Sequence, residues 1–517
     1  MKQVGNKDKD SVRVAGRGVI YITFAKLWFM VTGYVLIFGL PRIFKWASGG
    51  DADQGQILFG AYKLVFMGVS FINNGIVTGT IQAVSKFTSE DENQASAIRR
   101  TALKVQGLIG LTLAALYAGF AGLIADLLGS QDLANLMRLS AVVIAAYSCY
   151  SVFIGSFNGQ RLFHRQALFD ITYATIKTAL IIGLAAVGFQ VLGTVLGFLI
   201  SSVVIMTAAA VVSGLGHEGG FPAKRYLAFA VTLVAYTFLL NLVMSLDLFL
   251  LKGLSSNLAL DAGMTPEKAS ELGKALTGRY GAAQGLAFIP YQAILSIAFV
   301  AFPLISKVTF EGDKEKTRDY INSTMRFTAI LIVGLATVFA ALPAQSLGLI
   351  FPEEYKVAAD ALRILSLGIA AFGLMVISNT ILNGAGLPRK AIVTVLITLS
   401  AVIGMVVFFI TRATPDNSTL VGAAIGSAAG MLIGLIISGY SVYRQFGGFM
   451  PVITALRVLL AAGIGVGAGM AMPDAGKLFT LVECMGVLLI YFAVLIASRE
   501  FTKDDLSKLR RVISRKK

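Results

Sequence analysis

The sequence has little charge, almost no cysteine or histidine, and no motif of nucleotide or metal chemistry. Of its 517 residues 14% are charged, two are cysteine and two are histidine. Two cysteines cannot build a disulfide framework. No Walker loop, dinucleotide fingerprint or metal-spaced His/Cys set is present. We therefore expect no cofactor, no metal and no enzymatic activity driven by nucleotide hydrolysis.

Apolar residues are abundant. They make up 56% of the chain, and the mean hydropathy is +0.77. A soluble chain of this length could not bury so much apolar surface, and each membrane crossing needs about 20 apolar residues. The candidate crossings are residues 18–43, 57–84, 101–128, 134–158, 166–188, 190–213, 224–251, 279–306, 321–343, 358–384, 390–412, 418–442, 452–472 and 478–498. The sequence predicts an all-α polytopic membrane protein with about 14 transmembrane helices.

The net charge of +16 comes from short clusters of Lys and Arg between the apolar runs. This pattern is typical of membrane topology rather than of nucleic-acid binding. The basic residues concentrate in alternate connections and above all in the two tails. We therefore expect both termini in the cytoplasm, a location in the inner (plasma) membrane, and no nucleic-acid partner.

One sequence pattern occurs twice in the chain. Phe59-Gly60-Ala61 opens an apolar run that ends at Ser85-Lys86-Phe87-Thr88-Ser89-Glu90, and Tyr280-Gly281-Ala282 opens another that ends at Ser306-Lys307-Val308-Thr309-Phe310-Glu311. Both ends are offset by 221 residues. An internal repeat of this kind often marks a transporter.

A second repeated motif supports the internal duplication. Asn158-Gly159 follows the fourth apolar run, and Asn383-Gly384 follows the tenth. Two halves of six helices each enter the membrane from the same side, so an axis along the membrane normal relates them and leaves a central cleft. The predicted divisions are 1–216 for the N-lobe, 217–446 for the C-lobe, 447–498 for two appended helices and 499–517 for a basic cytoplasmic tail.

Several short motifs, taken in order, resemble a known family. They are Phe59-Gly60, Asn74-Gly75-Ile76, Ser85-Lys86, residues 276–282, Pro290, Pro303, Ser306-Lys307, Asn379, Asn383-Gly384-Ala385-Gly386 and Pro388-Arg389. Together they resemble the multidrug/oligosaccharidyl-lipid/polysaccharide (MOP) exporter superfamily and, within it, the polysaccharide (Wzx-like) flippases. The resemblance implies a two-lobed alternating-access carrier. Its cargo would be an undecaprenyl-diphosphate-linked oligosaccharide, and an ion gradient or the membrane potential would drive it.

The resemblance also implies the partners and the alternatives. We expect a lipid-linked anionic glycan as substrate, contacts with membrane lipids, cooperation with a polysaccharide polymerase or glycosyltransferases, and a monomeric carrier. A lipid II flippase and a cation-coupled multidrug exporter are the alternatives on the same fold. A membrane glycosyltransferase would place acids or histidines on a large outer loop, and residues 252–278 hold few.

Three lysines lie inside the predicted spans. A charged side chain at mid-membrane costs about 2.5–3.5 kcal/mol on insertion scales, so each needs a reason. Lys26, Lys63 and Lys177 predict a cationic cleft that attracts a diphosphate. For Lys63 the alternative is snorkelling to the membrane surface. For Lys177 it is a link to Asp170, two helical turns earlier.

Two arginines flank the spans of the second half. Arg279 opens the run 279–306 and is a fourth candidate for the cleft, because lipid II flippases of this superfamily carry cations on their eighth helix. Its position at the helix end differs from that pattern. Arg326 lies near an inner end, where an anchor in the inner leaflet is the alternative.

The ion-coupling candidates are Asp247, Thr394 and Thr398. A carboxylate in a cleft can take H⁺ or Na⁺, and the two threonines are four residues apart on one helix face. The alternative for Asp247 is a salt bridge to Lys252.

Three further features concern the conformation of the chain. Pro290 removes a helical hydrogen bond, which predicts a gate or a fixed kink in the run 279–306. Residues 252–278 predict a short outer helix that begins at Thr265-Pro266-Glu267. The tail 499–517 predicts either an amphipathic helix on the membrane or a solvated segment.

Overall fold

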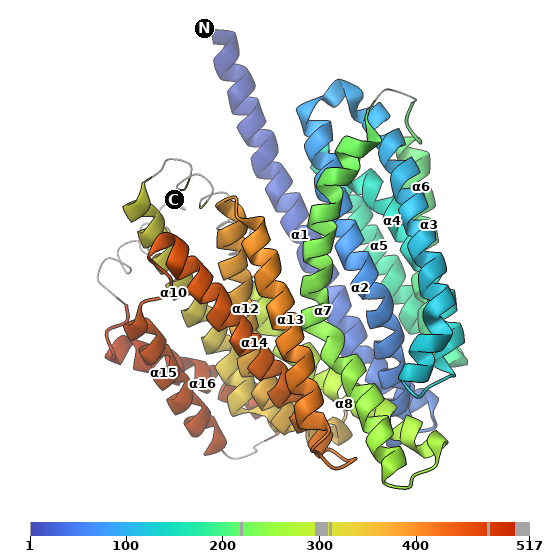
Figure 1. Cartoon of the computed structure of the whole chain (residues 1–517), viewed down its shortest axis with the longest axis vertical. Helices are drawn as coiled ribbons and strands as arrows, with labels where there is room; N and C mark the ends of the chain where they lie inside the picture. Colours follow the sequence, from blue (N-terminus) through green and yellow to red (C-terminus); the bar gives the residue numbers. More distant parts are fainter. Residues whose placement is uncertain are drawn as a thin grey trace. The chain divides into compact units, whose positions relative to one another are not determined.

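The computed structural model describes residues 2–217, 221–294, 305, 309, 313–472 and 476–501. Within these ranges the chain forms helices and turns and no strand (Figure 1). The chain divides into two compact units, Met1–Gly278 and Arg279–Lys517. The expected all-α polytopic fold is confirmed.

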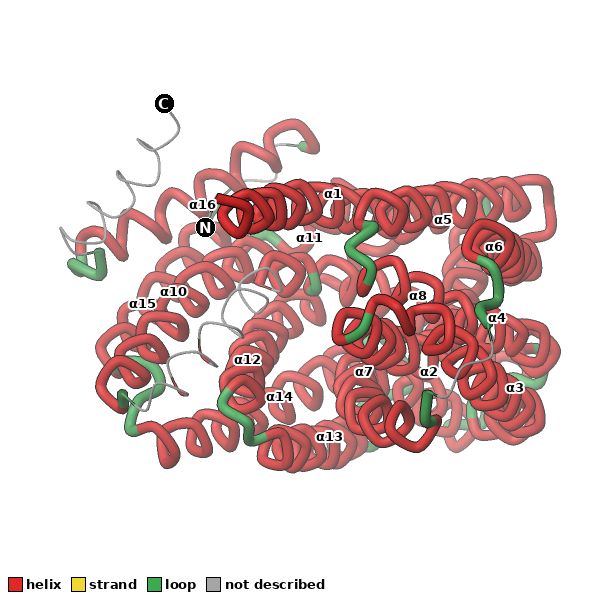
Figure 2. The backbone as a smooth tube through the Cα atoms, turned by 90° about the horizontal axis from the view of Figure 1, so that it is seen from above, coloured by secondary structure: helices red, strands yellow, loops and turns green. Residues whose placement is uncertain are grey.

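Unit 1 holds the first seven long helices and the start of an eighth. They are α1 (Lys2–Ala47), α2 (Ala52–Glu90), α3 (Ala95–Leu127), α4 (Leu133–Gly159), α5 (Phe163–Leu184), α6 (Gln190–Ser213), α7 (Ala223–Asp261) and α8 (Pro266–Ala287). A short 3-10 turn, Glu92–Gln94, precedes α3. The helix α4 is central, since α2, α3 and α6 pack against it, and α1 packs along α5 (Figure 2).

Small residues allow these helices to pack closely. The helices α5 and α6 form an antiparallel hairpin through the π-helical turn Ala185–Phe189, where Gly188 adopts a φ of 103°. A Cβ on Gly193 would lie 2.6 Å from Leu184 O, and one on Gly197 would lie 2.7 Å from Ile181 N. Glycine at such positions lets backbones approach where lipid supplies no hydrophobic drive for association.

Unit 2 continues α8 and holds the remaining helices. They are α10 (Lys314–Ala341), α11 (Pro343–Ile350), a 3-10 segment Glu353–Ala358, α12 (Ala359–Gly384), α13 (Pro388–Ile410), α14 (Ser418–Phe446), α15 (Val452–Met470) and α16 (Lys477–Ala497). The helices α12, α13 and α14 pack together, while α15 and α16 pack against α10. The Tyr491 hydroxyl donates to Ile330 O at 3.0 Å and fixes α16 to α10.

The predicted spans agree with the helices that the structure describes. Twelve helical stretches among these residues are long and apolar enough to cross a membrane. One of them, Phe163–Ser213, contains the α5–α6 hairpin and so comprises two predicted spans. The predicted span 279–306 runs into positions outside the described ranges, as do most of the second copy of the repeat's end and the tail 502–517.

Two boundaries differ from the sequence prediction. Residues 252–278 are not a connector with a separate short helix, because α7 runs on to Asp261 and α8 runs unbroken from Pro266 to Ala287. The compact units divide after Gly278, whereas the sequence predicts a division after residue 216. The reason is packing: α7 lies along α2 and therefore belongs with unit 1.

Candidate substrate and ion site

Lys177 lies on α5 inside unit 1, with 7% of its surface exposed. Its Nζ is 4.4 Å from the centroid of the Phe29 ring on α1 and 5.4 Å from that of Tyr173. Among the described residues it forms no hydrogen bond or ion pair. Aromatic faces attract a cation, but they do not replace a counter-charge. An anion could therefore bind here.

Lys63 on α2 is in a similar position. It is 8% exposed, and its Nζ lies 5.6 Å from the centroid of the Phe59 ring. In the described part of the chain it too has no hydrogen bond or ion pair. A snorkelling lysine keeps its ammonium in water, and a buried side chain does not fit that alternative.

The two buried lysines lie at different levels of unit 1. Gly159 at the end of α4 packs on Thr88 near the end of α2, and α5 begins four residues later at Phe163. Lys63 is 25 residues before Thr88 on α2, and Lys177 is 14 residues after the start of α5. With a rise of 1.5 Å per residue, these positions are roughly 38 Å and 21 Å from that common end.

Lys26 differs from the other two lysines because it has an acidic partner. It is exposed on α1 and interacts electrostatically with Asp170 on α5. The Tyr150 hydroxyl lies 3.5 Å from Asp170 Oδ1. Asp170 is therefore the partner of Lys26, and the alternative link between Asp170 and Lys177 is not formed.

The aromatic residues around these groups were not predicted from the sequence. The ring centroids of Tyr147 and Tyr150 on α4 lie 5.1 Å and 5.9 Å from that of Tyr173 on α5. The available signal was spacing, since Asp170, Tyr173 and Lys177 follow one face of a helix. The contribution of α4 could not be read from that spacing.

Asp247, the predicted ion-coupling acid, is fully buried on α7. Its Oδ1 accepts from Leu248 N at 2.9 Å. The alternative salt bridge to Lys252 is not formed, because the Lys252 ammonium donates to Leu128 O at 2.7 Å and to Ser256 Oγ at 2.8 Å. Lys252 thus ties α7 to the end of α3.

The predicted threonine partners of Asp247 belong to unit 2. Thr394 Oγ1 donates to Lys390 O at 2.9 Å, and Thr398 Oγ1 donates to Thr394 O at 2.8 Å. Both hydroxyl protons are thus used within α13, although each oxygen keeps acceptor capacity. Asp247 and the two threonines are described within separate units, so a shared ion site stays a prediction.

Arg279 and Pro290 lie on and just after α8. Arg279 Nη1 donates to Asn417 Oδ1 at 2.9 Å, next to the start of α14. The helix ends at Ala287, and Phe288 forms a turn two residues before Pro290. The predicted discontinuity is therefore present, while the gate stays a prediction.

Arg326 has a clear structural partner in unit 2. Its Nε donates to Glu500 Oε1 at 2.7 Å, and Arg457 Nη1 donates to Glu500 Oε2 at 3.0 Å. Thr454 Oγ1 also donates to Glu500 Oε1, at 2.8 Å. Burial acts to raise the pKa of Glu500, but these hydrogen bonds outweigh it and hold the pKa below its ordinary value. The cluster joins α10, α15 and the residues after α16.

Metal-ligating side chains do not gather in the described ranges. No group of three or more His, Cys, Asp or Glu that could hold a metal ion occurs there.

Comparisons with known structures define the class of fold. The structure of the lipid II flippase MurJ in an inward closed conformation matches with a TM-score of 0.69 at 16% identity, covering 93% of this chain and 99% of that one. Outward-facing and inward-facing multidrug resistance MATE transporters of the MOP superfamily each match with a TM-score of 0.60, at 18% and 16% identity, covering 83% of this chain and 95% and 98% of theirs. The chain has the fold of the MOP exporters.

The comparison with protein families covers a smaller part of the chain and agrees with the structural comparison. Residues 58–261 match the family described as polysaccharide biosynthesis protein. No sequence match was found among curated proteins. Both findings agree with the resemblance drawn from the sequence, since part of the chain matches a polysaccharide biosynthesis family and the fold is that of the MOP exporters. The chain is a multi-pass membrane protein.

Proposed function

We propose that the chain is a flippase for an undecaprenyl-diphosphate-linked oligosaccharide in the inner membrane. The observation that carries the proposal is the pair of buried lysines in unit 1, Lys63 and Lys177, which face aromatic rings and have no acid partner among the described residues. Burying such charges is costly unless an anion binds there. A diphosphate between lipid and sugar would supply that anion.

The other groups of the site have supporting roles in this proposal. Lys26, which interacts electrostatically with Asp170, would turn toward the diphosphate when the cargo arrives. Arg279, which lies inside α8 rather than at a helix end, would meet the cargo where Asn417 now accepts its hydrogen bond. The tyrosines on α4 and α5 would contact sugar rings by their faces.

The energy source and setting belong to the same proposal. An ion gradient of H⁺ or Na⁺, acting at Asp247 with Thr394 and Thr398, or the membrane potential would drive transport, with no cofactor. The carrier would work as a monomer with both termini in the cytoplasm. A polymerase or glycosyltransferases would handle the glycan on either side of the membrane.

A lipid II flippase is the second candidate. The MurJ structure matches 93% of this chain, more than the 83% that the MATE structures match. Lipid II also carries a diphosphate, so the lysine site fits it equally well. A cation-coupled drug exporter fits the two buried lysines poorly, since they would repel a cationic drug.

A transport assay in vesicles tests the proposal. The purified protein is reconstituted with a labelled undecaprenyl-diphosphate-linked glycan, and outward exposure is followed with Lys63→Met, Lys177→Met and the double variant. Methionine keeps the bulk and removes the charge. Loss of one charge-assisted contact should slow transport about tenfold or more.

The matched control is Lys268→Gln, which removes a charge from an exposed position on α8. Its rate should equal that of the unchanged protein. Wild-type rates in the double variant would refute the diphosphate site. A parallel assay with lipid II separates the two candidates, because the better substrate gives the faster exposure in vesicles of the same composition.

A further inference from the structure

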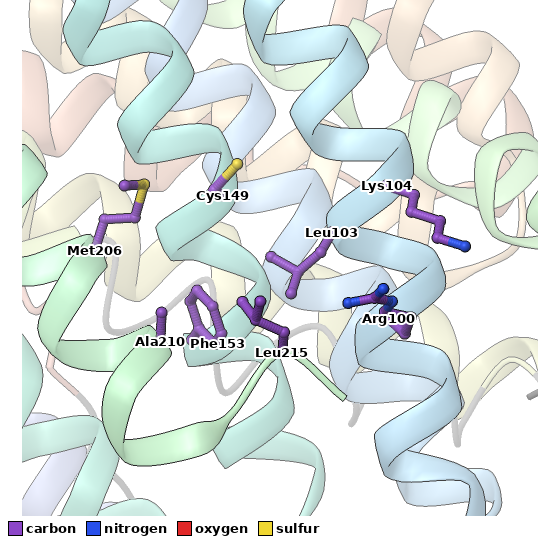
Figure 3. Close-up of a pocket in the computed structure, with 8 residues that line it drawn as sticks. All are labelled: Arg100, Leu103, Lys104, Cys149, Phe153, Met206, Ala210 and Leu215. Atoms are coloured by element: carbon purple, nitrogen blue, oxygen red, sulfur yellow. The ribbon is translucent and has the colours of Figure 1, made fainter. Parts of the chain in front are cut away.

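A pocket in unit 1 lies apart from the lysine site. Its volume is about 410 Å³. It is an open pocket lined by α3, α4, α6 and the residues just after α6 (Figure 3). Its lining residues are Arg100, Leu103, Lys104, Cys149, Phe153, Met206, Ala210 and Leu215.

The walls of this pocket are apolar, and its charge is concentrated on α3. Figure 3 shows the Arg100 guanidinium pointing toward Leu103 and Leu215. The Lys104 ammonium points away from the other lining residues (Figure 3). The pocket therefore combines a cation, which attracts an anion, with an apolar surface, which attracts a hydrocarbon chain.

Arg100 is half-buried and has no hydrogen bond or ion pair to any residue in the described ranges. Its Nε is fully buried and has no hydrogen-bond partner in the part of the chain that the structure describes. A guanidinium that is partly removed from water without an acceptor is unfavourable, and its planar fork suits a phosphate.

The position of the pocket indicates where such a phosphate would come from. Arg100 lies five residues after Ala95, the first residue of α3, and is therefore roughly 7–8 Å inside the helix end. Leu215 follows the end of α6 at the same level, since Gly216 packs on Ser96 and Arg100. This is the depth of lipid head groups relative to a span that begins at the membrane surface.

We propose that this pocket binds one anionic phospholipid of the bilayer, with its phosphate on Arg100 and an acyl chain along Leu103, Phe153 and Met206. The charge of Arg100 complements the phosphate, and the apolar walls exclude a ligand that is phosphate alone. The bound lipid would fill the space between α3 and α6 at the surface where, by the predicted topology, the membrane faces the cytoplasm. The site is separate from the proposed transport of a glycan.

Native mass spectrometry of the purified protein with phosphatidylglycerol tests the proposal. Arg100→Gln should weaken binding of the most tightly held lipid about tenfold or more, as expected for a lost contact to a charged group. Ala210→Phe fills the pocket while keeping the charge and should weaken binding as well. Lys224→Gln removes a charge from an exposed position at the start of α7, outside the pocket, and should leave this lipid bound.

Additional measurements identify the source of the phosphate and test whether each variant is folded. Phosphatidylcholine with the same chains should bind more weakly, and inorganic phosphate should not displace the lipid. Each variant is first shown to have the wild-type melting temperature without added lipid, and phosphatidylglycerol should raise the melting temperature of the wild type but not of Arg100→Gln.

Three results would overturn the proposal. They are equal affinity in the Arg100→Gln protein, equal losses in the Arg100→Gln and Lys224→Gln proteins, which would indicate a diffuse surface attraction, and displacement of the lipid by inorganic phosphate. A transport rate unchanged by Arg100→Gln leaves the proposal intact, since the two sites are separate. If Lys63→Met and Lys177→Met fail to slow transport, the proposed function falls and the lipid site stands.

Discussion

Two groups of interior cations, one in each unit, have opposite surroundings, although unit 1 also pairs the buried Lys274 with Asp132 at 2.6 Å. In unit 2, Arg326 and Arg457 share the buried carboxylate of Glu500. In unit 1, Lys63 and Lys177 are buried against aromatic rings without an ion pair among the described residues. A neutralised cluster holds helices together, whereas cations without a counter-charge make a site for a ligand. The difference separates stability from function within one chain.

The largest effect should follow from breaking the paired cluster. Glu500→Gln would leave Arg326 and Arg457 without their carboxylate, and we expect the free energy of unfolding to fall by about 3 kcal/mol. Thermal unfolding in detergent measures the loss. Glu353→Gln is the control, because its pair with Lys356 is mostly exposed and its loss should matter by about 0.5 kcal/mol or less. Equal melting temperatures for the two variants would show that the cluster does not stabilise unit 2.

Acid should weaken the same cluster. The pKa of Glu500 is lowered in the folded protein from its ordinary value of 4.5. Its contribution to stability is therefore complete above about pH 4.5 and is lost as the pH falls through the lower, folded pKa. The gap in melting temperature between wild type and Glu500→Gln should be constant at neutral pH and narrow below this value. A gap that is independent of pH would contradict the charge argument.

An opposite sign is expected for the unpaired cations. Lys177→Met removes a buried charge without breaking an ion pair, so the free energy of unfolding should rise by about 1 kcal/mol while transport slows. Thermal unfolding and the vesicle assay on the same preparation measure both. A protein that loses stability and transport together would indicate that Lys177 is structural, which would remove the contrast between the units.

The smallest effect is expected at the surface of unit 1. Arg225 Nη2 and Glu90 Oε2 are 3.0 Å apart, but both side chains are substantially exposed. Glu90→Gln should change the free energy of unfolding by about 0.5 kcal/mol or less, because water screens the pair. A larger fall in the free energy of unfolding, measured by thermal unfolding, would show that surface ion pairs also stabilise unit 1. The contrast between the two units would then be weaker.

Much of the fold follows from the sequence. Each apolar run must satisfy its backbone within itself in lipid, so its length gives a helix, and the helices α2, α4 and α12 lie within a few residues of the predicted runs. The break near Pro290 was also predictable, since proline cannot donate in a helix. The division between units was not, because it depends on α7 packing along α2.

The candidate site divides in the same way between sequence and structure. Three lysines in apolar runs stand out in a sequence, because a charge in lipid is costly wherever it lies along the chain. Their partners do not stand out. Asp170 is seven residues from Lys177 yet interacts electrostatically with Lys26 on another helix, and Lys252 donates to Leu128 O rather than to Asp247.

Local composition is sufficient to predict that this chain crosses the membrane many times and carries cations inside it. Which cations are paired and which are open to a ligand is seen only in the folded chain. Pairing depends on which helices lie side by side and how their faces are turned, and residues distant in sequence, such as Arg326 and Glu500, meet only after the helices have packed.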